Sequence, residues 1–317
     1  MWSKLVILCY HRVEDYTCDP VKITVSNNNF LKHIHYLKRY TNIIHPDQFF
    51  DFLKNRKRFP KRSILLTFDD GYSSYLQTMS LLHDQSISAV FFISSKKEKH
   101  WWDILSNILL QNRSVNEKKY KTINTLISDL DGKFEIEKNI DSNFTDELRR
   151  WKITDKGYPF YRNKAFYLIA DKIMNAEYFE QKRIIKILSQ LSNEKRDFSY
   201  LMNDKLINYH RIGFHTVNHL NLSKLDYKSQ KNEIVLGKKD FELMIKKRIN
   251  IFAYPFGAQY HYNDETLKIV KNNFSYAFAN FCGLIHKDSN LYELPRFLVR
   301  NWPIDKFEKE INNFFNT

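Results

Sequence analysis

Short apolar segments alternate with helix-like segments along most of this chain, and this alternation constrains the fold more than any other feature. Each apolar segment is bounded by polar or turn residues, which is typical of a strand buried on both faces. The segments between them have helical spacing, as where Ser26 is a plausible N-cap for a helix burying Phe30 and Ile34. Strands that alternate with helices predict right-handed crossovers and a parallel sheet. The predicted strands are 5–10, 42–44, 64–68, 87–93, 212–214, 249–254, 275–279 and 297–299.

The alternation stops between residues 96 and 196, where helical patterns replace the strand-like runs. Because strands and helices alternate again afterwards, we interpret this stretch as a helical insertion within one domain of residues 1–317. The chain has 317 residues, of which 43% are apolar, so it can bury a large core. Seven or eight parallel strands in one chain predict an α/β fold, a closed or nearly closed β/α barrel.

The net charge is strongly positive, since 50 Lys and Arg stand against 36 Asp and Glu, a difference of +14. Such a charge is compatible with binding to nucleic acid, with work near anionic lipid, or with a lysine-rich solvated surface. No zinc-finger, RNP-like or helix-turn-helix signature accompanies the charge, so we expect no nucleic-acid partner. The mean hydropathy of −0.53 and the lack of a long apolar run argue against a membrane span.

Cysteine usage and the N-terminal residues both favour a cytoplasmic protein. Cys9, Cys18 and Cys282 form no CxxC pair and are odd in number, which favours a reducing compartment over a disulfide framework. The apolar run at 5–10 is shorter than a signal-peptide core and lacks a small-residue cleavage site after it. We therefore predict a cytoplasmic location.

The predicted strand at 64–68 runs directly into two adjacent carboxylates, Asp69 and Asp70, followed by Gly71. Two such carboxylates are costly to desolvate together unless a cation or a proton lies between them. A metal ligand beside a general base would explain the pair, and an ordinary exposed turn is the alternative. In a β/α barrel, this position is the edge of the sheet where chemistry takes place.

Three further strand ends carry candidate functional residues. His215 and His219 are four residues apart, a spacing that places both imidazoles within reach of one metal ion if the segment turns as a helix does. A Tyr-Pro-Phe-Gly turn at 254–257 could direct backbone N–H groups at a developing oxyanion. His11 follows the first strand. Each of these features is also common as ordinary surface or core structure, and their occurrence together is what makes them informative.

Three ordered motifs, TFDDG at 67–71, HTVNH at 215–219 and FAYPFG at 252–257, resemble the signatures of the polysaccharide deacetylase family, the NodB-homology domain of carbohydrate esterase family four. The segments LCYHRV at 8–13 and LPRFLVRN at 294–301 resemble a subgroup common in bacterial surface-glycan loci. The resemblance covers residues 1–95 and about 200–302, and it implies a distorted (β/α)7-type barrel and a metal-dependent deacetylase.

The resemblance also implies roles for individual residues. Asp70, His215 and His219 would bind a divalent metal, most fittingly Zn2+, and Asp69 would be the general base. The backbone N–H of Phe256 would stabilise the oxyanion. The residues expected to contact the substrate are Tyr72, Tyr254, Pro255 and Arg296.

The sequence departs from the family pattern in three respects. Ala253 stands where many members have an arginine that orients the base. Neither the Asp-rich fourth motif nor the Leu-x-His motif that supplies a general acid follows residue 257. We expect His11, at the end of the first strand, to be the general acid. We expect Arg296 or Arg300, in the last predicted strand, to replace the missing arginine.

These features together predict a hydrolase that removes an N-acetyl, or an O-acetyl, group from a sugar of a surface polysaccharide or its lipid-linked precursor. Its partner would be an acetylated sugar or glycan. The positive charge would also allow peripheral association with an anionic membrane. Two alternatives stay open. One is a deacetylase-like fold acting on a non-sugar amide, and the other is a catalytically weak basic binding protein.

Overall fold

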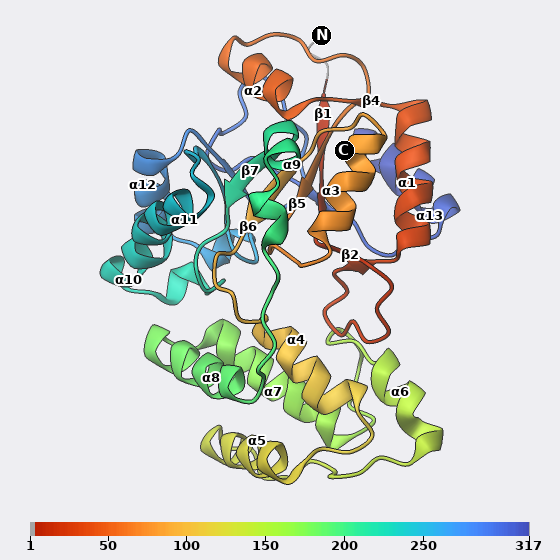
Figure 1. The fold of residues 1–317 in the computed structure, drawn as a ribbon, viewed down its shortest axis with the longest axis vertical. Coiled ribbons are helices and arrows are strands. Elements are labelled where there is room, and N and C mark those ends of the chain that lie inside the picture. The colour runs from red at the N-terminus through yellow and green to blue at the C-terminus, as the bar shows by residue number, and fades with distance from the viewer. Residues whose placement is uncertain (1–3, 317) are drawn as a thin grey trace. The chain divides into compact units, whose positions relative to one another are not determined.

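The computed structural model describes residues 4–316 and divides into two compact units (Figure 1). The barrel unit comprises Met1–Asp15, Ile23–Lys96 and Asp197–Thr317. The helical unit comprises Tyr16–Lys22 and Lys97–Arg196, and the second of these segments lies where the sequence predicts an insertion.

The centre of the barrel unit is a parallel sheet that curls without closing. Within residues 4–316 its strand order is β10-β1-β5-β6-β7-β8-β9, and β4 pairs with β5 beside this path. The sheet is a curled half-barrel, so the predicted α/β barrel class is confirmed. At its open side, between β9 and β10, an isolated bridge joins Phe278 to Leu294. The strands are β1 (Leu5–Tyr10), β4 (Asn42–Ile43), β5 (Ser63–Phe68), β6 (Val90–Ile93), β7 (Arg211–Phe214), β8 (Ile251–Ala253), β9 (Tyr276–Phe278) and β10 (Phe297–Leu298).

The side chains on the concave face of the sheet fill the barrel interior. Successive residues of a strand point to opposite faces, so Leu5, Ile7 and Leu65 share this face with Phe92 and Ile251. Phe49 and Phe59 join the same core. Because the barrel is filled with apolar side chains, polar groups on the same face lie at the ends of the strands.

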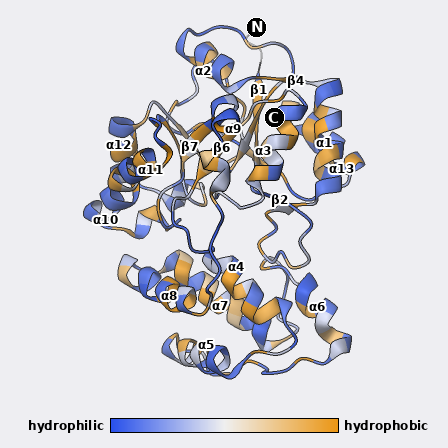
Figure 2. Cartoon of the chain, in the orientation of Figure 1, coloured by the Kyte–Doolittle hydropathy of each residue, from blue (hydrophilic) through white to orange (hydrophobic). Residues whose placement is uncertain are grey.

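Helices pack around the sheet, and apolar residues alternate with hydrophilic ones along them (Figure 2). The predicted N-cap Ser26 is confirmed, since its side chain accepts a hydrogen bond from the Asn29 N–H. Phe68 on the outer face packs edge-on against Phe30 and stacks on Phe91. The helices of the barrel unit are α1 (Asn27–Tyr40), α2 (Pro46–Lys54), α3 (Tyr75–Asp84), α9 (Asp204–Tyr209), α10 (Tyr227–Lys231), α11 (Gly237–Ile245), α12 (Asp264–Asn273) and α13 (Ile304–Asn316).

Two helices differ from the sequence prediction. The apolar spacing of residues 227–247 predicts one long helix, but in the structure a π-helical segment, Asn232–Leu236, separates α10 from α11. The C-terminal helix α13 was not predicted, although it buries Phe307 and Ile311. A small parallel pair of strands, β2 (Arg12–Val13) and β3 (Thr24–Val25), was also not predicted, because two residues are too few for a recognisable pattern.

The helical unit has its own apolar core. Trp101, Trp102 and Trp151 are almost fully buried, so they belong to this core, whereas Tyr158 and Tyr161 are exposed. Buried Arg162 donates hydrogen bonds to the carbonyls of neighbouring loops. Its helices are α4 (Trp101–Leu105), α5 (Glu117–Asp129), α6 (Thr145–Arg150), α7 (Tyr161–Asn175) and α8 (Tyr178–Gln190), and a π-helical segment at Ser106–Gln111 extends α4. No helix within residues 4–316 is long and apolar enough to cross a membrane.

Candidate active site

The alternation of the strands brings the predicted site residues together at the carboxyl edge of the sheet. In β1, Ile7 faces the interior, so Cys9 and His11, which follow at two-residue intervals, face it too. In β5, Leu65 faces the interior, so Thr67 and Asp69 face it as well. Parallel pairing of β1 with β5 sets Cys9 opposite Thr67, so both strands end at one level.

Gly213 of β7 shows why the histidine strand approaches this cluster closely. A Cβ atom at Gly213 would lie 2.4 Å from Cδ1 of Phe92, so a larger residue would push β7 away from β6. Gly213 therefore faces the interior, and His215, two residues on, points the same way at the end of the strand.

Asp70, His215 and His219 form a compact group of buried metal-ligand atoms. The Nε2 atoms of His215 and His219 lie 3.5 and 3.3 Å from Oδ1 of Asp70. Ligands about 2.0–2.1 Å from a tetrahedral zinc ion would be about 3.3–3.4 Å apart, so these separations fit such an ion. Two imidazoles and one carboxylate also leave coordination positions open, as a catalytic site requires.

The surroundings of His215 fix which ring nitrogen faces the group. Its Nδ1 lies 2.7 Å from the carbonyl oxygen of Ala253, to which it donates, so Nε2 carries the lone pair directed at Asp70. Burial acts to raise the pKa of Asp70, but the pKa lies well below its usual value, and the charge of His11 is the largest influence that lowers it. The residues present therefore fit a divalent metal ion.

The HTVNH loop is held by a carboxylate from the π-helical segment. Glu233 accepts hydrogen bonds from the backbone N–H groups of Val217 and Asn218, at 3.2 and 2.8 Å. The Asn218 side chain donates to the other oxygen of Glu233 at 2.5 Å. Thr216 Oγ1 accepts from the His219 N–H. These bonds fix the backbone between the two histidines.

Asp69 forms a bidentate ion pair with Arg296 inside the barrel. Nη1 and Nη2 of Arg296 lie 2.7 and 2.6 Å from Oδ1 and Oδ2 of Asp69, and both residues are buried. Arg296 Nε also donates to the carbonyl of Ala279, and Nη1 donates to Thr67 Oγ1. Burial acts to raise the pKa of Asp69, but Arg296 and then His215 lower it overall. Asp69 is therefore held as an oriented carboxylate.

His11 lies beside this ion pair. One ring nitrogen of His11, the Cys9 Sγ and one carboxylate oxygen of Asp69 all lie within 4.8 Å of one another. The His11 Nδ1 atom is buried without a hydrogen-bond partner among the described residues. Burial lowers the pKa of His11, although the charges of Asp70 and Asp69 act against this. The Cys9 thiol donates to Asp69 Oδ2 at 3.6 Å, and burial raises the pKa of this thiol.

The Pro-Phe-Gly turn packs directly against the second histidine. The ring of Phe256 meets that of His219 edge-on, with centroids 4.6 Å apart. Phe256 and Gly257 both have positive φ, 59° and 71°, and a Cβ at Gly257 would lie 2.6 Å from Cβ of Asn280. Asp70, Thr216 and His219 also have positive φ, at 86°, 62° and 52°. Strained backbone of this kind is concentrated at functional sites.

Comparison with known proteins agrees with this geometry. The family model described as polysaccharide deacetylase matches residues 56–143 and 155–276, which is most of the chain. The chain belongs to the polysaccharide deacetylase family.

Individual relatives of this polysaccharide deacetylase family member are distant. YxkH of Bacillus subtilis (strain 168), which is assigned as a polysaccharide deacetylase, is 34% identical over 89 residues, 28% of this chain. The match spans about a third of that protein, 31%. Solved structures share the fold at low identity. IcaB from Ammonifex degensii has a TM-score of 0.56 at 16% identity, covering 99% of this chain and 97% of that one. The Streptococcus pyogenes deacetylase PplD, in complex with acetate, has a TM-score of 0.54 at 15% identity, covering 98% and 99%.

The residues predicted to contact substrate lie in different settings in this family member. Tyr72 is buried, with the Arg12 guanidinium 5.0 Å from its ring centroid. Tyr254 is also buried, and its hydroxyl donates to the carbonyl of Tyr292 at 2.9 Å, so this side chain packs within the fold. Pro255 is buried in the turn beside Phe256. Arg296 contacts Asp69, as described above, and its arrangement is that of a positioning residue.

Sequence reasoning missed several residues that support the site. Glu233 stands in a predicted helix with no motif to single it out, and Cys9 is one apolar residue among several in its strand. Tyr75 donates a short hydrogen bond from its hydroxyl to the carbonyl of Asp69. Of these, only Cys9 could have been predicted from the sequence, because it lies two residues before His11 and alternate residues of a strand face the same side.

Proposed function

We propose that this chain is a metal-dependent deacetylase, a hydrolase acting on an N-acetyl or O-acetyl group of a sugar in a surface polysaccharide or its lipid-linked precursor. Membership of the polysaccharide deacetylase family supports amide or ester hydrolysis on an acetylated sugar. The observation that carries the proposal is the buried group of Asp70, His215 and His219 beside the Asp69–Arg296 ion pair. It combines metal ligands with an oriented base.

The metal ion would be held by Asp70, His215 and His219, and zinc suits two imidazoles and one carboxylate best. When bound, such an ion polarises an acyl carbonyl and lowers the pKa of water toward about 7. This is what an acetamide requires, because its carbonyl is a poor electrophile.

The chain's own residues would move the protons. Asp69, fixed through both oxygens by Arg296, would accept the proton of the attacking water. Asp69 Oδ2 also accepts a hydrogen bond from the Cys9 thiol, so Oδ1 has one donor fewer and would be the oxygen that takes the proton. His11, within 4.8 Å of Asp69, would deliver a proton to the departing nitrogen or oxygen of the sugar.

The turn after β8 would stabilise negative charge on the former carbonyl oxygen. The backbone N–H of Phe256 would donate to this oxygen from a turn that Asn280 braces through the carbonyls of Phe256 and Gly257. A preorganised donor of this kind needs no rearrangement as charge develops. Pro255 and Tyr72 would bound the site.

The proposed location is the cytoplasm, at the inner membrane surface, where a lipid-linked precursor would be available. Cys9, Cys18 and Cys282 are not joined in disulfides in the structure, which supports a reducing compartment.

The test combines metal analysis with acetate release from N-acetyl- and O-acetyl-sugar substrates. We expect about one equivalent of bound metal, acetate release that a chelator abolishes, and recovery when zinc is restored. His215→Ala should lose the metal, whereas Asp69→Asn should keep the metal and lose turnover. A purified protein that binds no metal and releases no acetate from a broad panel would contradict the proposal.

A further inference from the structure

The connection between α2 and β5 is the most basic segment of the chain. From Lys54, the last residue of α2, to residue 62, six of the nine residues are basic, and no acidic residue lies between Asp51 and Asp69. Lys54, Arg56, Arg58 and Lys61 are exposed. Phe59, in the middle of this connection, is buried in the barrel core, so the segment is anchored to the fold while its charges face solvent. The basic residues are Lys54, Arg56, Lys57, Arg58, Lys61 and Arg62.

Other helix-to-strand connections add positive charge at the same edge of the sheet. In a parallel sheet, every helix returns to the amino ends of the strands, so these connections share one edge. Lys246, Lys247 and Arg248 join α11 to β8, and Lys38 and Arg39 lie in the last turn of α1 before β4. This edge lies opposite the carboxyl edge that holds Asp69 and Asp70. We call these three connections the basic face.

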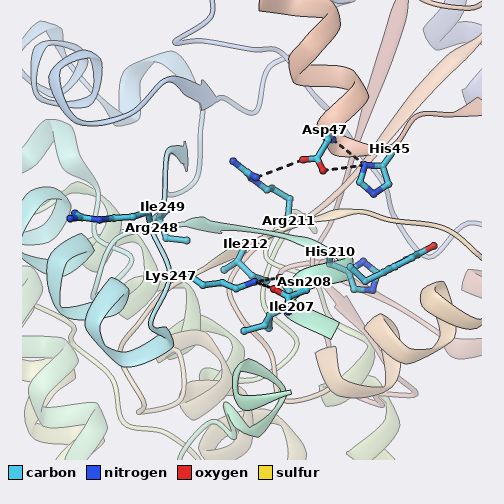
Figure 3. A pocket seen from close by; sticks show the side chains of 11 residues that line it. His45, Asp47, Ile207, Asn208, His210, Arg211, Ile212, Lys247, Arg248 and Ile249 are labelled. Atoms are coloured by element: carbon cyan, nitrogen blue, oxygen red, sulfur yellow. Dashed lines mark hydrogen bonds and ion pairs between the residues drawn. The ribbon is translucent and has the colours of Figure 1, made fainter. Parts of the chain in front are cut away.

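The residues that line two surface cavities show that these connections are neighbours in space. One cavity, of about 250 Å³, is lined by Arg211, Lys247 and Arg248 together with His45 and Asp47 at the start of α2. Figure 3 shows these lining side chains. A second, of about 650 Å³, joins the end of α1 to Pro60 of the basic connection and to the loop after α3. The charges therefore belong to one surface of the barrel unit.

Some cations of the basic face are already engaged, and others point outward. Lys247 donates to the carbonyl of Ile207 and to the Asn208 side chain. Beside the basic face, Nη1 of Arg211, the first residue of β7, lies 3.6 Å from Oδ1 of Asp47. The 250 Å³ cavity is thus not a site in which several cations converge on one small anion. Lys246 is exposed, and Arg248 is 96% exposed although its Nη1 lies 3.6 Å from Oε2 of Glu242. Such a spread of exposed charge suits an extended anionic surface better than a single phosphate.

Exposed apolar side chains accompany these charges. Tyr40, the last residue of α1, is 49% exposed, and Leu243, in the last turn of α11, is 77% exposed. Basic residues with exposed aromatic and aliphatic neighbours are the composition of a membrane-interface surface. The positive charge would also suit a nucleic acid, but an exposed leucine would add no favourable contact with one.

We propose that the basic face is a docking surface for an anionic lipid bilayer. Lysine and arginine near such a surface each contribute about 1 kcal/mol, about fivefold in partition coefficient, and the contribution falls with added salt. Docking through this edge leaves the carboxyl edge of the sheet, with the candidate active site, away from the headgroups. The proposal does not depend on the catalytic assignment, since its readout is binding alone.

The test is sedimentation of the full chain with vesicles of phosphatidylcholine alone or with 30% phosphatidylglycerol, at low and high salt. The first variant combines Lys54→Gln, Arg56→Gln, Arg58→Gln and Lys61→Gln. The matched control removes the same charge from exposed positions of the helical unit, by Lys118→Gln, Lys133→Gln, Lys156→Gln and Lys186→Gln. Circular dichroism and thermal unfolding check that all proteins fold alike.

We expect binding to the anionic vesicles only, a loss of at least about tenfold in the first variant, and less than about threefold in the control. Tyr40→Ser combined with Leu243→Ser should weaken the binding that remains at high salt. Equal losses in the two charge variants would show a general effect of net charge and would overturn the proposal. So would absence of binding to anionic vesicles, or tighter binding to a DNA duplex than to the vesicles.

Discussion

Replacing Arg296 with methionine tests the central electrostatic feature of the site. Methionine keeps most of the side-chain volume but leaves Asp69 as a buried carboxylate without its two guanidinium hydrogen bonds. Removing one partner of a buried ion pair costs about 3–5 kcal/mol, because the remaining charge is uncompensated. We therefore expect Arg296→Met to be destabilised by about this amount at neutral pH.

The pH dependence follows from the pKa of Asp69. In the wild type, folding lowers the pKa of Asp69. The ion pair therefore stabilises the fold fully at pH values above the unfolded-state pKa of about 3.9. This stabilisation is lost as the pH falls through the pKa of the folded state. In the variant, burial without Arg296 would raise the pKa instead. The difference in stability between the two proteins should then shrink on acidification, by up to about 1.4 kcal/mol per pH unit.

Urea unfolding of the chelator-treated proteins at pH 7 and pH 5 measures this difference, and acetate release measures turnover. We expect Arg296→Met to lose at least about a hundredfold in kcat at pH 7, because its base is protonated or misplaced. Arg300→Met is the control, since Arg300 was the other candidate from the sequence. A variant of Arg296 with wild-type turnover and an unchanged urea midpoint would refute the reasoning.

Three further predictions address the rest of the site. Glu233→Gln should weaken metal binding by about ten- to a hundredfold, because the HTVNH backbone loses its charged acceptor; a competitive chelator titration measures this, and unchanged affinity would contradict it. His11→Ala should retain the metal and lose about a hundredfold in turnover, whereas near-normal turnover would exclude His11 as the general acid. Gly257→Ala should be destabilised by about 1–3 kcal/mol in thermal unfolding, because it combines positive φ with a close approach to Asn280; an unaltered melting temperature would argue against a rigid turn.

Much of the fold could be predicted because the signals are local. Apolar runs and helical spacing depend on residues within a few positions of one another, and the strands they predicted recur in the sheet with ends that differ by at most three residues. The interruption of the helix at Asn232–Leu236 and the C-terminal helix α13 were missed. A π-helical turn leaves no mark in apolar spacing, and α13 lies beyond the LPRFLVRN segment at 294–301, the last motif of the sequence.

The sequence by itself determined that carboxylates and histidines stand at the ends of strands, and strand alternation placed Asp69, His11 and His215 on one face. Only the tertiary structure decided which side chains meet. Arg296 is 227 positions from Asp69, and it reaches this carboxylate because β10 pairs with β1, which pairs with β5. Likewise the basic connections before β4, β5 and β8 form one surface only because the strands are parallel. Such contacts depend on strand order and register, which no local pattern encodes.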